Sequence, residues 1–194
     1  MFLHKNQLAV ATEIKKVFHF NNESKSIHSL LSEIVSFIKI HLPSDSYEDK
    51  ISSCKQILIE LLTNGIKHSD TASSVITIVL ADNQVSISKS DSGRMFYLDN
   101  YTGWPPLQWP LEKKYLGEKI RIYSDDINQL YAVIESDQRI SFELIEYPIG
   151  TLTNDTNLME HYGLLILRKL SDEFFYAYDP SAGSNLFRAT IKLV

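Results

Sequence analysis

The sequence predicts an α+β protein in which helices pack on one face of a sheet. Two long segments, within residues 27–42 and 46–68, repeat apolar side chains at the three-and-four spacing of amphipathic helices. Several shorter segments alternate apolar and polar residues between turn signals, which is typical of antiparallel strands. Because both patterns occur within 194 residues of which 44% are hydrophobic, we expect one domain with a single sheet.

The first part of the chain predicts one strand and two helices. Residues 14–20 favour a short strand, and Pro43 ends the first helix. Ser46, followed three residues later by Asp49, resembles a capping box that opens the second helix. The apolar stripe of this second helix predicts that it ends near His68.

The rest of the chain predicts mainly strands. Two hairpins are expected, at 75–88 and 173–194, with a helix from Gly163 to 169 before the second. Between them, an insertion at about 97–160 contains three short alternating runs separated by polar turns. We expect these runs to form a meander at the edge of a mixed, mostly antiparallel sheet.

Composition excludes several classes of function. The formal net charge is −5, and there is no basic run, which argues against binding nucleic acid or an anionic membrane. Cys54 is the only cysteine and lies in an apolar helical pattern, so it is expected to be a small buried hydrophobe. No apolar run has the length of a signal peptide or a membrane span, so a cytoplasmic location is expected.

One face of the second helix groups side chains that suit nucleotide chemistry. Glu60, Asn64 and His68 are spaced by four, and Lys67 lies seven residues after Glu60. Carboxylate and amide oxygens suit Mg²⁺, and a lysine suits phosphate. The alternative is a solvated charged face at a helix end, where the helix dipole favours lysine and histidine.

Residues 60–68 match the pattern E-L-x-x-N-x-x-K-H at every fixed position. This stretch resembles the N-box of the ATPase superfamily that contains gyrase B, the 90-kDa chaperones, histidine kinases and mismatch-repair ATPases, in the variant of the anti-sigma-factor serine kinases. The resemblance implies a Bergerat-type α/β sandwich that binds ATP and Mg²⁺. It further implies that Asn64 holds the metal, that Lys67 and His68 bind the nucleotide, and that Glu60 orients or deprotonates the attacking group.

Two further boxes of this superfamily concern the adenine. Asp91 and Gly93 follow a strand and match its D-x-G motif, in which the aspartate accepts the adenine amino group. The second glycine of the fuller motif is Met95 here. Gly183 and Ser184 stand where the superfamily has Gly-Thr, whose hydroxyl helps to bind the adenine edge. Either motif alone is equally typical of an ordinary turn.

The last box begins a helix and concerns the phosphates. Gly163 and Leu164 match the superfamily pattern G-x-G-L, but His161 replaces its first glycine. In the superfamily these glycines offer backbone N–H groups to phosphate, and a helix N-terminus favours anions. His161 restricts the backbone φ and ψ angles at this position more than glycine would, although its imidazole can itself bind a phosphate. The alternative is an ordinary helix start.

These boxes lead to three hypotheses for the single domain of residues 1–194. The first is an ATP-binding regulatory kinase or ATPase that acts on a partner protein, either a phosphorylation substrate or a sigma- or anti-sigma-like regulator, and that can form a homodimer. The second is a degenerate module of the same fold that binds a protein without nucleotide turnover. The third is an unrelated α+β domain with chance matches, which predicts no cleft that joins Glu60, Asn64, Asp91 and Gly163.

The tryptophans bear on the second hypothesis. Trp104 and Trp109 lie beside three of the six prolines in one segment of the insertion. Such a segment can fold over a nucleotide or anchor a partner protein. It can equally form a small local core under the meander.

Overall fold

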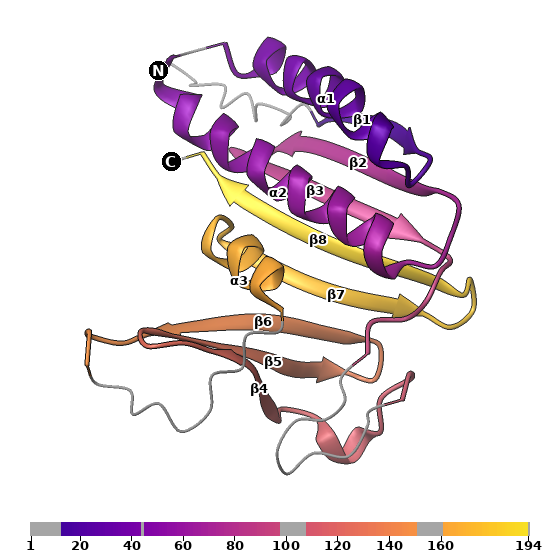
Figure 1. Cartoon of the computed structure of the whole chain (residues 1–194), viewed down its shortest axis with the longest axis vertical. Coiled ribbons are helices and arrows are strands. Elements are labelled where there is room, and N and C mark those ends of the chain that lie inside the picture. Colours follow the sequence, from indigo (N-terminus) through magenta and orange to yellow (C-terminus); the bar gives the residue numbers. More distant parts are fainter. Residues whose placement is uncertain (1–12, 44, 98–107, 151–160, 194) are drawn as a thin grey trace, which may run out of the picture.

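The computed structural model describes residues 13–43, 45–97, 108–150 and 161–193. In this part of the chain, three α-helices pack on one face of an eight-stranded antiparallel sheet with the strand order β1-β2-β3-β8-β7-β6-β5-β4 (Figure 1). The strands are β1 (Ile14–Phe20), β2 (Ser74–Ala81), β3 (Gln84–Asp91), β4 (Lys119–Ser124), β5 (Asn128–Ser136), β6 (Arg139–Glu146), β7 (Glu173–Asp179) and β8 (Ser184–Lys192). The helices are α1 (Ile27–His41), α2 (Glu48–His68) and α3 (Tyr162–Lys169).

The α+β class and the helices on one face are therefore confirmed. The expected mixed sheet is wrong for the described strands, since every pairing among them is antiparallel. The first hairpin, β2–β3, closes through Asp82 and Asn83, which both have positive φ angles, 50° and 59°. Two positive φ angles in a two-residue loop match the twist of the flanking strands, which explains why Asp-Asn suits this turn.

Helix α2 does not begin with the expected capping box. It starts at Glu48, with Tyr47 as its N-cap residue and no side-chain capping hydrogen bond. A 3-10 turn at Asp45–Tyr47 precedes it, so Ser46 lies inside that turn and not at the helix start. Acidic Glu48 and Asp49 in the first turn still favour this end of the helix through its dipole.

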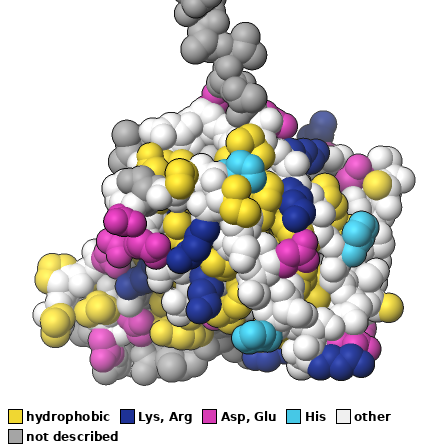
Figure 2. Space-filling view, turned by 90° about the horizontal axis from the view of Figure 1, so that it is seen from above, with side chains coloured by type: hydrophobic (Ala, Val, Ile, Leu, Met, Phe, Trp, Pro, Cys, Tyr) yellow, Lys and Arg dark blue, Asp and Glu magenta, His cyan; other side chains and the backbone are white. Residues whose placement is uncertain are grey.

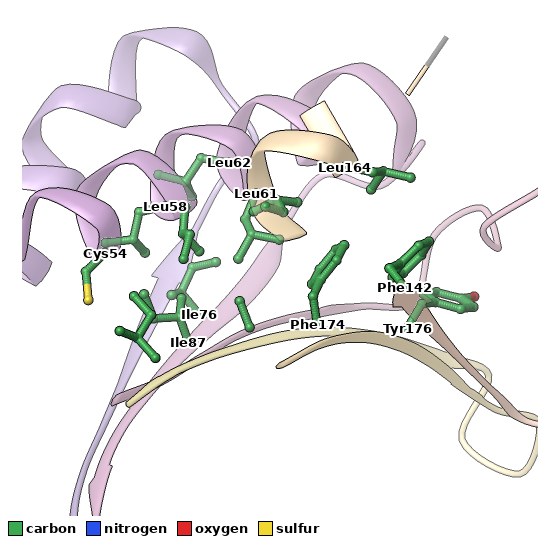
Figure 3. Packing of buried hydrophobic residues seen from close by; sticks show 14 of the residues in the cluster. Cys54, Leu58, Leu61, Leu62, Ile76, Ile87, Phe142, Leu164, Phe174 and Tyr176 are labelled. Carbon is green, nitrogen blue, oxygen red and sulfur yellow. The ribbon is translucent and has the colours of Figure 1, made fainter. Parts of the chain in front are cut away.

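The core lies between the helices and the sheet. In Figure 3, Leu58 and Leu61 of α2 project toward Ile76 and Ile87 of the first hairpin. Cys54 is fully buried in the same layer, as expected, and burial raises the pKa of its thiol to about 12. Cys54 therefore stays protonated at neutral pH and acts as a small packing residue.

The predicted meander forms β4, β5 and β6 and extends the sheet beyond β7, as expected (Figure 1). Strand β6 pairs with β7 at three positions only, from Arg139↔Ala177 to Ser141↔Phe175. Beyond this pairing, the rings of Phe142 and Phe174 stack with centroids 4.6 Å apart.

Trp109 packs against β7, an interior strand of the sheet. Its ring lies 5.0 Å from that of Tyr176, and its Nε1 donates to the carbonyl of Phe96 at 2.7 Å. The backbone N–H of Phe96 in turn donates to the Tyr176 hydroxyl at 3.2 Å. Trp109 therefore packs against the main hydrophobic core and not in a separate core under the meander, whereas Trp104 lies outside the described residues.

The described helices include none with the length and apolar character needed to cross a membrane. On the face shown in Figure 2, acidic and basic side chains are interspersed with hydrophobic ones. Neither sign of charge dominates that face.

Candidate functional site

A cavity of about 900 Å³ lies between α2, the start of α3 and the ends of β3 and β8. Its volume falls in the range of ligand sites in proteins, roughly 300–1,000 Å³. Eight of the eleven predicted site residues line it: Glu60, Asn64, Lys67, His68, Asp91, His161, Gly163 and Leu164. The cleft that the chance-match hypothesis excludes is therefore present. A smaller cavity of about 410 Å³, beside Phe20 and Leu30, contains no predicted site residue.

The last turns of α2 direct three polar side chains into the cavity. Glu60, Asn64 and Lys67 share this helix face, while the opposite face is buried against the sheet. Within the described part of the chain, no hydrogen bond or ion pair occupies these three head groups. A carboxylate, an amide and an ammonium are thus available to a ligand on one rigid element.

Gly163 brings the start of α3 against this polar face. A Cβ atom at Gly163 would lie 2.8 Å from Oε2 of Glu60 and 3.6 Å from Nδ2 of Asn64. Contacts of 2.8 Å are too short for a real Cβ atom, so any larger residue would displace the Glu60 carboxylate. Gly163 thus allows the start of α3 to approach Glu60 closely without moving that side chain.

Burial raises the pKa of Glu60, and the positive charge of Lys67 only partly offsets this effect. The carboxylate of Glu60 is therefore a better proton acceptor than that of an exposed glutamate. Burial and the charges of Lys67 and Arg94 lower the pKa of His68, which is consequently neutral at pH 7. The fixed cations of the cavity wall are Lys67 and Arg94 at its rim and the buried Lys89.

We expect Glu60→Gln to stabilise the fold at neutral pH and to have little effect below about pH 4. With a raised pKa in the folded state, the stability of the wild type falls as the pH rises from the ordinary carboxyl pKa through the raised one. Glutamine resembles the protonated form of Glu60 at every pH, so the free energy of unfolding of the variant does not fall in this pH range. Thermal melting across that pH range measures the effect, with Glu173→Gln, at an exposed position, as the control. A gap between variant and wild type that does not widen with pH contradicts this expectation.

Asp91 is buried and engaged by three partners. Its Oδ1 accepts hydrogen bonds from the Gly93 N–H and from Nδ2 of Asn185, both at 3.0 Å. Its Oδ2 forms an ion pair with the ammonium of Lys89. The Lys89 and Asp91 side chains are only 4% and 3% exposed, so the pair is shielded from solvent.

Sequence reasoning missed Lys89 and Asn185. The alternation of β3 was the available signal for Lys89, because the inward positions Val85 and Ile87 predict that residue 89 also faces inward. Asn185 directly follows the Gly-Ser box, but only the pairing of β3 with β8 shows that it lies opposite Asp91. Arg94, next to the D-x-G motif, is a further wall residue that the motif does not include.

Gly93, Gly183 and Ser184 do not line the cavity. A Cβ atom at Gly93 would lie 1.7 Å from the carbonyl oxygen of Ser69, so this glycine lets the D-x-G loop pack on the end of α2. Gly183 has a φ of 57° in the β7–β8 turn, with open space around it. Ser184 begins β8.

His161 adopts the left-handed conformation that glycine favours. Its φ and ψ are 66° and 23°, and it is the N-cap residue of α3, with its carbonyl accepting from the Leu164 N–H at 2.8 Å. A non-glycine residue in this region is strained by about 1–2 kcal/mol. The His161 ring packs 6.0 Å from that of Phe96.

Aromatic side chains form another wall of the cavity. Phe96 lines it and lies 5.4 Å from the ring of Tyr176 and 5.8 Å from that of Phe187. Met95, which replaces the second glycine of the D-x-G-x-G motif, adds an exposed apolar side chain beside it. Such a wall suits a planar ligand that stacks on it.

Outside the Lys89–Asp91 pair, the acidic and amide side chains of α2 and its C-terminal end that line the cavity and could offer oxygen to a metal ion are Glu60, Asn64 and Asp70. Among the described residues, no group of three or more His, Cys, Asp or Glu side chains is placed to hold one. Mg²⁺ is commonly bound through one or two carboxylates together with phosphate oxygens and waters. The donor set thus fits a Mg²⁺ ion that arrives with a phosphorylated ligand.

Comparison with known proteins adds no relative: no protein-family model matches the chain, and no curated protein is significantly similar to it. The geometry of the cavity and the motif pattern of the sequence are therefore the features that point to a function.

Proposed function

We propose that this cavity binds a purine nucleoside triphosphate together with Mg²⁺, and that the chain is a regulatory kinase or ATPase built on a Bergerat-type fold. The observation that carries the proposal is that Glu60, Asn64 and Lys67 project from one helix face into the cavity and have no hydrogen-bond or ion-pair partner among the residues that the structure describes. ATP is the nucleotide that the motif pattern implies.

The wall residues suggest a role for each part of such a ligand. Asn64 would supply an amide oxygen to the metal, which would neutralise phosphate charge when bound. Lys67 and Arg94 attract the phosphates from the rim, and the start of α3 favours the same negative charge. Phe96 offers a stacking surface for the base.

Glu60 is the group that we assign to the chemical step. Burial makes its carboxylate a stronger base, so it can orient a hydroxyl or a water and take its proton. The phosphoryl acceptor in this proposal is a hydroxyl of a partner protein or water. In phosphoryl transfer most of the acceleration comes from positioning and from charge neutralisation, so one such base suffices. A cytoplasmic location and a homodimer stay predictions.

Calorimetric titration of the full chain with purine nucleoside triphosphates, with and without Mg²⁺, tests the proposal. We expect micromolar to millimolar affinity that Mg²⁺ strengthens, and we expect Asn64→Ala to lose the strengthening by Mg²⁺. Gln56→Ala is the matched control, because Gln56 is an exposed amide on the same helix, outside the cavity. If no purine triphosphate binds at millimolar concentration, the proposal is wrong.

The buried ion pair between Lys89 and Asp91 favours a second candidate function, a degenerate module that binds a protein without nucleotide turnover. In that case the ion pair stabilises the fold and the cavity has no nucleotide to recognise. The two candidates differ in one measurement. Asn64→Ala impairs biological function under the first and leaves it intact under the second.

A further inference from the structure

One wall of the cavity carries a buried hydrogen-bond donor beside a buried acceptor. Lys89 and Asp91 both line the cavity, and their side chains form an ion pair although they are only 4% and 3% exposed. Both residues come from β3, two positions apart, so the alternation of the strand directs both side chains to the face of the sheet that the helices cover. The pair is therefore part of the cavity wall and not a contact between mobile surface side chains.

Both members of the pair keep hydrogen-bonding capacity. Oδ1 of Asp91 accepts from the Gly93 N–H and from Nδ2 of Asn185, whereas Oδ2 accepts only from Lys89 among the described residues. A carboxylate oxygen has room for a second donor, and an ammonium has three N–H groups, of which Asp91 engages one. An acceptor position on Oδ2 and N–H donors on Nζ thus lie side by side.

Packing against α2 holds the Lys89 side chain in place. A Cβ atom at Gly65 would lie 2.7 Å from Cε of Lys89 and 3.6 Å from its Nζ, so the lysine stem fills the space that this glycine leaves. A donor that is already ordered loses little side-chain freedom when a ligand binds to it. Lys89 is therefore better prepared to bond a ligand than a lysine on the surface.

We infer that Lys89 is a second base-contacting residue, which together with Asp91 binds the edge of a purine where a hydrogen-bond donor and an acceptor are adjacent. This inference rests on the proposed nucleotide-binding function. A 6-amino purine offers its amino N–H to Asp91 and the adjacent ring nitrogen to Lys89. A 6-oxo purine offers its ring N–H to Asp91 and its carbonyl oxygen to Lys89. The cavity accepts both kinds of base, whereas the D-x-G motif alone implies recognition of the adenine amino group.

A purine without a substituent at position 6 separates this contact from simple stacking. Its ring nitrogen can still accept from Lys89, but it has no N–H to donate to Asp91. The lost hydrogen bond is one to a charged group, and such bonds are the stronger kind. The ring of Phe96 can stack on any purine, and in the proposed function Asn64 and Lys67 meet only the metal and the phosphates. A difference among these bases therefore reports on Lys89 and Asp91.

Three nucleotides serve as probes in calorimetric titrations of the full chain with Mg²⁺: ATP, inosine triphosphate and the triphosphate of unsubstituted purine riboside. We expect ATP and inosine triphosphate to bind within about threefold of each other, and the unsubstituted purine about tenfold or more weakly than either.

A double variant tests the assignment to the ion pair. Lys89→Met with Asp91→Asn removes both charges together, and we expect it to bring the three affinities to within about threefold of one another. The matched control is Lys119→Met with Glu143→Gln, which removes a half-exposed ion pair outside the cavity and should keep the wild-type order of affinities.

Each outcome separates the role of Lys89 from the proposed function. A larger difference between ATP and inosine triphosphate, in either direction, overturns the joint contact of Lys89 and Asp91 with the base. Equal affinity for all three nucleotides overturns base recognition by the pair and leaves nucleotide binding standing. A wild-type order that survives in the double variant overturns the assignment to these two residues. Failure of all three to bind at millimolar concentration overturns nucleotide binding itself. The wild-type comparison decides the inference whether or not the double variant folds.

Discussion

Gly93→Ala is expected to destabilise the fold by about 3 kcal/mol or more, at the upper end of the overpacking effects seen in protein cores. The added Cβ atom would lie 1.7 Å from the carbonyl oxygen of Ser69 and 2.7 Å from its carbonyl carbon. These are backbone atoms, so no side-chain rotation relieves the clash. The same carbonyl accepts a hydrogen bond from the Arg94 N–H at 2.6 Å, and a shift of the loop that avoids the clash would break this bond.

Urea or thermal unfolding measures this effect. For a chain of this length, 3 kcal/mol corresponds to a drop in melting temperature of about 6–12 °C. Ser92→Ala is the matched control, because Ser92 is the exposed neighbour in the same loop and its variant should stay within about 0.5 kcal/mol of the wild type. A Gly93→Ala protein as stable as the Ser92→Ala protein would show that the D-x-G loop does not pack on α2.

Asp91→Asn is expected to destabilise the protein by about 3–5 kcal/mol, because it leaves the buried ammonium of Lys89 without a counter-charge. Asparagine keeps the shape of the side chain and an oxygen that can accept from Gly93 and Asn185. The loss therefore reports on the charge of Asp91 rather than on its size or on these two hydrogen bonds.

A double-mutant cycle with Lys89→Met separates the ion pair from other effects. The variant that carries both Lys89→Met and Asp91→Asn has no buried charge at this place and should be more stable than the Asp91→Asn protein. Glu143→Gln is the control, because Glu143 forms an ion pair with Lys119 whose side chains are about half exposed, and such pairs contribute about 1 kcal/mol or less. Strict additivity of the two single effects would contradict a direct interaction between Lys89 and Asp91.

The elements in which apolar residues recur at a regular spacing could be predicted from the sequence. The apolar stripe of α2 predicts its end at His68, and the spacing of Glu60, Asn64 and Lys67 then places these residues on one face of the helix. Both predictions follow from the period of 3.6 residues per turn of an α-helix. The start of α2 could not be predicted in the same way, because a 3-10 turn and a helix have similar local signals, and Ser46 fits either.

The residues that the sequence missed are those whose role depends on contacts between distant strands. Lys89 is recognisable as inward-facing from the alternation of β3, but its pairing with Asp91 and its contact with Gly65 depend on how α2 crosses the sheet. Asn185 meets Asp91 through strand register over 94 positions of sequence. The order of the motifs predicted that Asp91 and Gly163 lie in one cavity. The positive charge beside Asp91 could not be predicted in this way, because Lys89 lies outside every motif.

The narrow junction between β6 and β7 has a consequence for the cooperativity of unfolding. The pairing of β7 with β8 covers seven positions, whereas that of β6 with β7 covers three, from Arg139↔Ala177 to Ser141↔Phe175. Segments of a protein that share few backbone hydrogen bonds tend to open as separate units. We therefore expect the backbone amides of the meander to exchange faster than those of β1, β2, β3, β8 and β7, although the meander shares its hydrophobic core with these strands. The face of α2 that carries Glu60, Asn64 and Lys67 and the Lys89–Asp91 pair lie outside the meander.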